Sequence, residues 1–395
     1  MSCAKAYTPI NHNAMQFQFI NSQDAFNAVC KSALNASFVA LDTEFVRTRT
    51  YYPKLGLIQL FDGTHLSLID PLEINDWQPF IQLLENEATV KVLHSCSEDM
   101  EVFLCYFKTV PTPLFDTQFA AGLLGFGASL GYAKLVADFL DVALDKGESR
   151  TDWLQRPLSA EQLQYAANDV EYLYQLYPLL KAKTDECQRT QWVFDEMAQL
   201  ALKKRHGLPS DYAYLTIKNN WQLSGKSLMA LKLIAGWRLD KAREQDMALN
   251  FIIRETSVLD IARNCPTDKR TLANLGCLSG KELRLYGDEI IALVKQALDS
   301  DESAYPTKVK RLPDVSGYKK TLHALREICL KKSESDNIKP ELLASKNQIN
   351  QLLKWHWFTP NEFEASGLLP DLATGWRKHI VYDELMAFLT RTSPE

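Results

Sequence analysis

Short apolar runs alternate with turn-forming residues in the first part of the chain. Between 38 and 70 three such runs, rich in β-branched and aromatic residues, are separated by turns such as Asp62-Gly63. The pattern predicts a meander of three strands, and the run at 16–20 predicts a strand before it. A helix is expected around 77–84 and a further buried strand at 90–95. Strands followed by alternating helix and strand are typical of an α/β fold with a mixed sheet.

The chain turns helical after residue 97. Ser159 and Gln162 have the spacing of a capping box, and Pro157 just upstream also fits the start of a helix. The predicted helices of this part cover 97–107, 116–124, 129–140, 159–182 and 187–204.

Two polar interruptions that contain proline and glycine divide the remainder, at 203–214 and at 299–317. Such interruptions are typical of domain boundaries, and the stretches after them are expected to be all-helical. These two stretches match at an offset of 90 residues, so that Glu244 corresponds to Glu334. A repeat of this length indicates two copies of one small helical domain. The predicted division is a tail at 1–15, a first domain at 16–205, and helical domains at 211–298 and 312–395.

Composition narrows the class of protein. With 395 residues the chain is too long for one ordinary core, and its 46% apolar and 24% charged residues are typical of a globular protein. The sequence contains no apolar stretch long enough to span a membrane. Its first residues also lack a basic end followed by an apolar run, which is the pattern of a secretory signal. We therefore expect a cytoplasmic protein without a membrane partner.

Cysteine usage and charge exclude two further classes. The eight cysteines include no C-x-x-C pair, which fits neither a zinc site nor a secreted disulfide framework. A net charge of −5 argues against a protein that coats nucleic acid by bulk electrostatics. Binding to RNA would therefore require local basic patches and bound metal.

Acidic residues at the end of a predicted strand carry the clearest chemical signal. Asp42 and Glu44 lie two residues apart and therefore share one face of the strand. Two ionised carboxylates side by side repel each other unless a cation lies between them, and their oxygens favour Mg²⁺ or Mn²⁺. Alone, such a pair is more often a solvated strand edge or a helix cap than a metal site. Asp99, just inside a helix after a buried strand, and Tyr165 with Asp169, four apart on another helix, strengthen the metal-binding hypothesis.

Three motifs in this order resemble a known family. The D-x-E of Asp42 and Glu44, the H-x-x-x-x-D that ends at Asp99, and the Y-x-x-x-D that ends at Asp169 are similar to the exonuclease motifs of the DEDD superfamily, in its tyrosine-bearing branch. All five acidic and tyrosine positions match. The phrases LGLIQL, FDTQFAAGLLG and TDWLQRPLSAEQLQYAANDVEYL resemble the ribonuclease D family in particular. The helical stretches resemble the helicase-and-RNase-D C-terminal (HRDC) domain, in tandem.

The resemblance implies a fold and a chemistry. The fold would be a ribonuclease H-like exonuclease fold with a mixed sheet, followed by two small all-helical HRDC-like domains. The chemistry would be phosphodiester hydrolysis with two Mg²⁺ or Mn²⁺ ions, to which Asp42 would bind as a shared ligand. Glu44 and Asp169 would complete the side that activates water, and Asp99 would support the side of the leaving group. Tyr165 would orient the attacking water, since a phenol is a poor general base; its alternative role is that of a core aromatic.

Several other residues have both a functional and a structural interpretation. Gln59 and Tyr52 are candidates for contact with the terminal nucleotides, and packing or turn formation explains them equally well. His94 ends a buried strand, which favours a structural hydrogen-bonding residue over a substrate contact. Asp116 is expected to cap a helix rather than bind metal. Trp153 is expected to pack near the third motif.

The resemblance also implies a substrate. We expect hydrolysis of RNA from a free 3′ hydroxyl with release of nucleoside 5′-monophosphates, and tRNA precursors as the RNA, with no obligate protein partner evident. Basic residues at the domain joints, such as Lys203 and Lys204, are either phosphate contacts or solvated surface. Two alternatives stay open: a DNA 3′→5′ exonuclease, since only contacts to the 2′ hydroxyl distinguish the sugar, and a catalytically inert nucleic-acid-binding adaptor.

Overall fold

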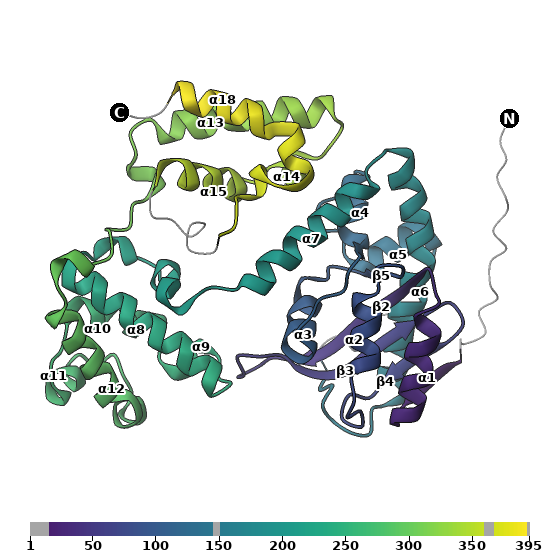
Figure 1. Ribbon diagram of the computed structural model, residues 1–395, viewed down its shortest axis with the longest axis horizontal. Helices are drawn as coiled ribbons and strands as arrows, with labels where there is room; N and C mark the ends of the chain where they lie inside the picture. The colour runs from purple at the N-terminus through teal and green to yellow at the C-terminus, as the bar shows by residue number, and fades with distance from the viewer. Residues whose placement is uncertain (1–15, 145–150, 359–366, 393–395) are drawn as a thin grey trace.

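The computed structural model describes residues 16–144, 151–358 and 367–392. The predicted tail at 1–15 lies outside these residues. The first part of the chain forms a six-stranded sheet in the order β1-β4-β3-β2-β5-β6 (Figure 1). Its strands are β1 (Phe17–Ile20), β2 (Phe38–Val46), β3 (Lys54–Phe61), β4 (Leu66–Ile69), β5 (Val90–Leu93) and β6 (Leu114–Asp116).

The sheet is mixed, as predicted. Strands β2, β3 and β4 form the expected antiparallel meander. The run at 16–20 is a strand, but β1 pairs in parallel with β4 rather than continuing the meander. Strand β5 lies parallel to β2, and the short β6, which the sequence pattern did not indicate, lies parallel to β5.

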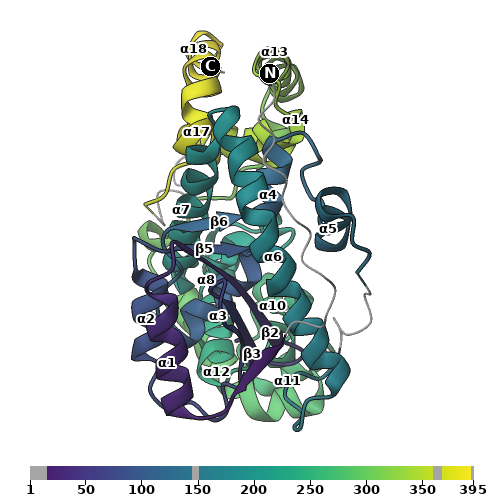
Figure 2. The ribbon, with the colours of Figure 1, turned by 90° about the vertical axis from the view of Figure 1, so that its right-hand side faces the viewer.

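Helices cover both faces of the sheet. Successive side chains along a strand point to opposite faces, and in these strands the side chains on both faces are apolar. Leu41 and Ile58 lie in the core beneath the early helices, whereas their neighbours Ala40 and Leu57 lie in the core on the opposite face. Figure 2 shows α1 and α2 on one side of the sheet and α5 and α6 on the other. The helices of this domain are α1 (Gln23–Ala33), α2 (Gln78–Glu85), α3 (Ser97–Phe107), α4 (Thr117–Leu123), α5 (Tyr132–Leu140), α6 (Ala160–Glu186) and α7 (Thr190–His206).

Two helical domains follow. In the described residues each domain contains a four-residue helix that is followed by a longer helix, and the distance along the chain between the starts of the two helices is the same in both domains. Helix α9 begins at Leu249 and α14 at Pro340, while α10 begins at Glu255 and α15 at Lys346. Both pairs are 91 residues apart, one more than the offset of 90 suggested by the sequence. The helices are α8 (Gly225–Glu244), α9 (Leu249–Ile252), α10 (Glu255–Asn264), α11 (Lys269–Asn274) and α12 (Gly280–Asp299) in the first domain, and α13 (Tyr318–Ser335), α14 (Pro340–Leu343), α15 (Lys346–Trp357), α17 (Gly375–Arg377) and α18 (Asp383–Arg391) in the second.

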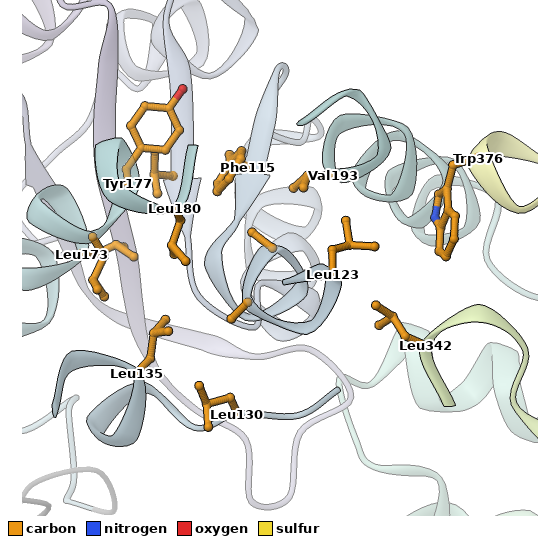
Figure 3. Close-up of a cluster of buried hydrophobic side chains, with 14 of the residues drawn as sticks. Phe115, Leu123, Leu130, Leu135, Leu173, Tyr177, Leu180, Val193, Leu342 and Trp376 are labelled. Atoms are coloured by element: carbon orange, nitrogen blue, oxygen red, sulfur yellow. The ribbon is translucent and has the colours of Figure 1, made fainter. Parts of the chain in front are cut away.

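The second helical domain shares a core with the sheet domain, whereas the first has a core of its own. Leu342 and Trp376 of the second domain lie beside Leu123 and Val193, which belong to α4 and α7 (Figure 3). The ring of Trp376 stacks on that of Trp192 at 5.1 Å, measured between centroids. The second helical domain and the sheet domain are therefore packed as one unit.

The lysines at the first joint form ion pairs between elements. Lys203 on α7 pairs with Asp371 of the second helical domain, and Lys204 pairs with Glu101 on α3. Both side chains thus stabilise the packing of α7 against its neighbours. Within the described part of the chain, none of the helices has the length and apolarity to traverse a bilayer.

Candidate active site

The first two acids project from one face of β2. Asp42 lies opposite Gln59 of β3 and Glu44 opposite Leu57, so both carboxylates face the layer that contains α6. Asp169 lies on α6, which packs across β2 and β3. Carboxylate oxygens of Asp42, Glu44 and Asp169 all lie within 4.8 Å of one another. A strand pair and a helix thus bring together acids that are far apart in the sequence.

The fourth acid, Asp99, lies beside this group of three. It belongs to the first turn of α3 and is 7% exposed. Thr43, between the two acids of β2, points to the opposite face and donates its hydroxyl proton to Asp99 Oδ1 at 2.5 Å. The strand therefore holds Asp42 and Glu44 through its backbone and Asp99 through Thr43.

Burial raises the pKa of all four acids, and repulsion by the other acids of the cluster adds to this effect for Asp42 and Glu44. Burial, followed by the charges of Asp169 and Asp99, raises the pKa of Glu44 to about 9. Burial likewise raises the pKa of Asp169 to about 7 and that of Asp99 to about 6. The pKa of Asp42 lies well above its usual value because of burial and the three neighbouring acids.

This donor set fits a divalent cation. Among the residues that the structure describes, the charged groups that shift the pKa of Asp42 and Glu44 are all acids. Clustered carboxylates without a basic partner are the oxygen ligands that hard cations such as Mg²⁺ and Mn²⁺ prefer. The cluster is therefore a candidate metal site.

Stabilisation by Mg²⁺ is expected to grow as the pH rises from 6 to 9. Because Glu44 and Asp169 have folded-state pKa values of about 9 and about 7, above those of the unfolded chain, folding without metal takes up protons, and metal-free stability falls as the pH rises through this interval. Mg²⁺ would bind the ionised forms and offset their repulsion. Melting temperatures with Mg²⁺ and with EDTA at both pH values test this, and a gain that does not change with pH would contradict it.

Tyr165 and Tyr132 contact Asp169 from two sides. A hydrogen bond from the Tyr165 hydroxyl to the Asp169 carboxylate partly offsets the effect of burial on the pKa of Asp169. Burial and the nearby acids raise the pKa of Tyr165, so its phenol stays protonated. Tyr132 on α5 donates to the backbone carbonyl of Asp169. These contacts fix the turn of α6 that carries the acid.

The segment before α6 fixes its start. The capping box of Ser159 and Gln162 is present, as predicted. Trp153 is 2% exposed, its ring centroid lies 6.2 Å from that of Tyr165, and a Cβ at Gly56 would lie 2.6 Å from its carbonyl oxygen. The glycine of LGLIQL thus allows this segment to approach β3. Trp153 is a packed core residue, as expected.

The remaining candidates lie in different surroundings. Gln59 is fully buried, and its side-chain amide has no hydrogen-bond partner among the described residues. Tyr52 is 37% exposed in the loop between β2 and β3. His94 Nδ1 lies 3.0 Å from Thr117 Oγ1, and its ring packs on that of Tyr132. Asp116 caps α4 by accepting a hydrogen bond from Phe119 N–H, as predicted.

Two residues of this arrangement were not predicted from the sequence. Thr43 lies inside the D-x-E motif, and strand alternation alone places it on the opposite face, but its partner on α3 is not visible in the sequence. Tyr132 has no motif around it. Only the packing of α5 against α6 brings its hydroxyl to Asp169.

Comparisons with protein families match all three parts of the chain. Residues 17–185 match a family described as 3′-5′ exonuclease. Residues 227–294 match the HRDC domain, and residues 316–385 match the C-terminal HRDC domain of ribonuclease D. The tandem helical domains are therefore HRDC domains, and the fold class expected from the sequence is confirmed.

Individual proteins give the same result. The chain is 46% identical to ribonuclease D of Serratia proteamaculans over 375 residues, which cover 95% of this chain and 99% of that protein. It is 44% identical to ribonuclease D of Escherichia coli, over 94% of this chain and 98% of that protein. A crystal structure of Escherichia coli RNase D, described as an exoribonuclease involved in structured RNA processing, superposes with a TM-score of 0.91 at 43% identity and covers 96% of this chain and 100% of that chain.

Proposed function

The chain belongs to the ribonuclease D family and is a 3′→5′ exoribonuclease, and from this premise we propose that its clustered acids hold the divalent metal at which RNA is hydrolysed. The observation that carries the proposal is the meeting of Asp42, Glu44 and Asp169 within 4.8 Å without a basic partner among the described residues. Exonucleases of this family use divalent metals. We also propose that two ions bind at this cluster and that they are Mg²⁺ or Mn²⁺.

Each acid would have its own share in holding the ions. Asp42, whose pKa is raised by the charges of all three other acids, would be the shared ligand, and Glu44 and Asp169 would complete the side of the attacking water. Asp99, outside the group of three, would support the side of the leaving group. When bound, the ions would supply activation of a water molecule and stabilisation of the leaving 3′ oxygen, and the products would be nucleoside 5′-monophosphates.

Tyr165 would orient the attacking water rather than remove its proton. Its raised pKa keeps the phenol protonated, so the hydroxyl is a donor and a positioning group. The hydrogen bond to Asp169 and the packing against Trp153 hold the ring in place. The hydroxyl is thus positioned next to a proposed metal ligand.

Tyr165→Phe is expected to lower kcat by roughly 10²-fold, the lower end of the range for one positioned catalytic group, with little change in KM. The phenylalanine keeps the ring packing and removes the hydroxyl alone. Single-turnover digestion of RNA measures the rate, and the Mg²⁺-induced rise in melting temperature should persist because the four acids remain. Wild-type kcat in this variant would assign Tyr165 a packing role only.

Gln59 and Tyr52 are proposed to act around the terminal nucleotides, and His94 is proposed to brace the acid cluster. The unpaired amide of Gln59, opposite Asp42, has hydrogen-bonding capacity that no described residue uses, and this supports a contact with substrate or with the metal-bound shell. The exposure of Tyr52 supports stacking on a base. For His94, the contacts with Thr117 and Tyr132 support a role in bracing Tyr132, and hence Asp169, in place of direct substrate contact.

We propose that the two HRDC domains recognise RNA and set how closely a folded RNA approaches the acids. The proposed domain boundaries are 16–205, 211–298 and 312–395. Precursors of tRNA are the proposed substrate and the cytoplasm the proposed compartment, in keeping with a relative described as acting in structured RNA processing.

A digestion assay tests this function. A 5′-labelled RNA with a free 3′ hydroxyl is incubated with Mg²⁺ or with EDTA, beside a DNA strand of the same sequence and a tRNA precursor with a 3′ extension. We expect a ladder that shortens from the 3′ end, that EDTA abolishes and that is weaker on DNA. Equal digestion of DNA would favour the DNA exonuclease, and RNA binding without digestion under any metal would favour the inert adaptor.

A further inference from the structure

We propose that the junction between the exonuclease domain and the first HRDC domain forms a stacking surface for the single-stranded 3′ tail of RNA on its way to the acids. This junction surface consists of Arg49, Tyr52, Tyr106 and Phe251. The inference rests on the proposed function and deepens it, because it assigns to the first HRDC domain a direct contact with the RNA tail.

The two domains meet at the loop between β2 and β3. The N–H of Tyr52 donates to Asp246 Oδ1 at 2.9 Å, and the N–H of Ala248 donates to the carbonyl of Arg49 at 2.8 Å. The guanidinium of Arg243 on α8 lies 6.0 Å from the ring centroid of Tyr51. Figure 1 shows this loop extending from β2 and β3 toward α9. The first HRDC domain therefore fixes the conformation of a loop that continues directly from the strand of Asp42 and Glu44.

Exposed aromatic side chains gather at this junction. The large exposed aromatics in the described residues are Phe19, Tyr52, Tyr106, Phe126 and Phe251. Three of these five belong to the junction surface, and they are 37%, 42% and 49% exposed in chain order. The Tyr106 hydroxyl accepts from Leu55 N–H at 2.9 Å, at the far end of the same loop. The Phe251 ring centroid lies 5.9 Å from the guanidinium carbon of Arg49.

Positive charge at the junction is available to phosphates. Arg49 and Lys54 are exposed, and neither forms an ion pair within the part of the chain that the structure describes. The nearby acids are engaged: Glu101 pairs with Arg47 and Lys204, and Asp246 accepts the Tyr52 N–H. In a chain with a net charge of −5, the junction therefore offers a local basic surface.

The junction surface also lies close to the proposed metal ligands along β2. Arg47, where the loop begins, is three residues beyond Glu44, and at about 3.3 Å per residue this places it roughly 10 Å from the proposed metal ligands. Exposed aromatics interleaved with cations bind single-stranded nucleic acid by base stacking and backbone attraction, with little dependence on sequence. Such a surface would lead an unpaired tail of any sequence toward the acids.

Binding and kinetics with matched variants test the proposal. In full-length Asp42→Asn protein with Mg²⁺, which leaves the RNA uncut, Phe251→Ala is expected to weaken binding of a 5′-labelled ten-nucleotide RNA roughly tenfold without changing its salt dependence. Arg49→Ala should reduce the slope of log affinity against log salt by about one. Phe251→Trp should restore binding. In the active protein, Phe251→Ala should raise KM more for the ten-nucleotide RNA than for a dinucleotide.

Phe19→Ala is the matched control, because Phe19 is an exposed aromatic on β1, the edge strand farthest from β5 and β6. It should bind the RNA as the parent does. Equal affinity of Phe251→Ala and Phe19→Ala, with digestion by the wild type intact, would overturn the junction surface alone. Failure of the wild type to digest RNA would overturn the proposed function instead.

Discussion

Asp42→Asn is expected to lower kcat by at least roughly 10³-fold, the upper end of the loss seen when one charge-stabilising group is removed from an active site. Asparagine has nearly the same shape as aspartate and lacks its negative charge. The charges of all three other acids act on Asp42, so its neutralisation should weaken the proposed binding of metal on both sides of the scissile phosphate. Single-turnover digestion of the 5′-labelled RNA at saturating Mg²⁺ measures the loss.

The same variant should be more stable than the wild type when metal is absent. Removing one of several buried, mutually repelling carboxylates relieves the repulsion that raises their pKa values, so the melting temperature in EDTA should rise and the gain from Mg²⁺ should shrink. Asp138→Asn is the control, since among the described residues Asp138 pairs with the exposed Lys134 on α5, away from the acid cluster. Near-normal digestion by Asp42→Asn would show that this carboxylate is not a metal ligand.

Most of the acid cluster could be predicted from the sequence because its members obey local periodicities. Asp42 and Glu44 share a strand face by the period of two, and Tyr165 and Asp169 share a helix face by their spacing of four. Gln59 could be placed near the cluster only after the strands had been paired. Its full burial depends on the packing of α6, which no local pattern contains.

The parts that were missed depend on contacts distant in sequence or on very short elements. Strand β6 has three residues, too few to show an alternating pattern, and β1 pairs with β4 across almost 50 residues. Helix α1 was also not predicted, although Phe26, Cys30 and Ala33 have the spacing of a buried helix face and could have indicated it. The roles of Lys203 and Lys204 could not be predicted, since their partners Asp371 and Glu101 lie in other elements.

The two HRDC domains differ in how they attach to the exonuclease domain. The first meets it through backbone and charged contacts at the β2–β3 loop and keeps a separate core. The second continues the core of the exonuclease domain, and Glu196 on α7 accepts hydrogen bonds from both Trp376 and Arg377. The second domain is therefore integrated into the core of the exonuclease domain, whereas the first is attached to it at the β2–β3 loop.

Trp376→Ala is expected to destabilise the unit formed by the exonuclease domain and the second HRDC domain by about 3–5 kcal/mol, the usual cost of truncating a large buried aromatic. Trp376 is 1% exposed, stacks on Trp192, and donates to Glu196 at 2.9 Å, so its removal opens a cavity and leaves a partly buried carboxylate with one partner fewer. Urea unfolding followed by tryptophan fluorescence measures the loss. Trp237→Ala is the matched control, because Trp237 also donates to a carboxylate, Glu289, at 2.8 Å, but lies partly exposed within the first HRDC domain. An equal loss in both variants would mean that Trp376 contributes no more to stability than a partly exposed tryptophan, which would contradict the expectation.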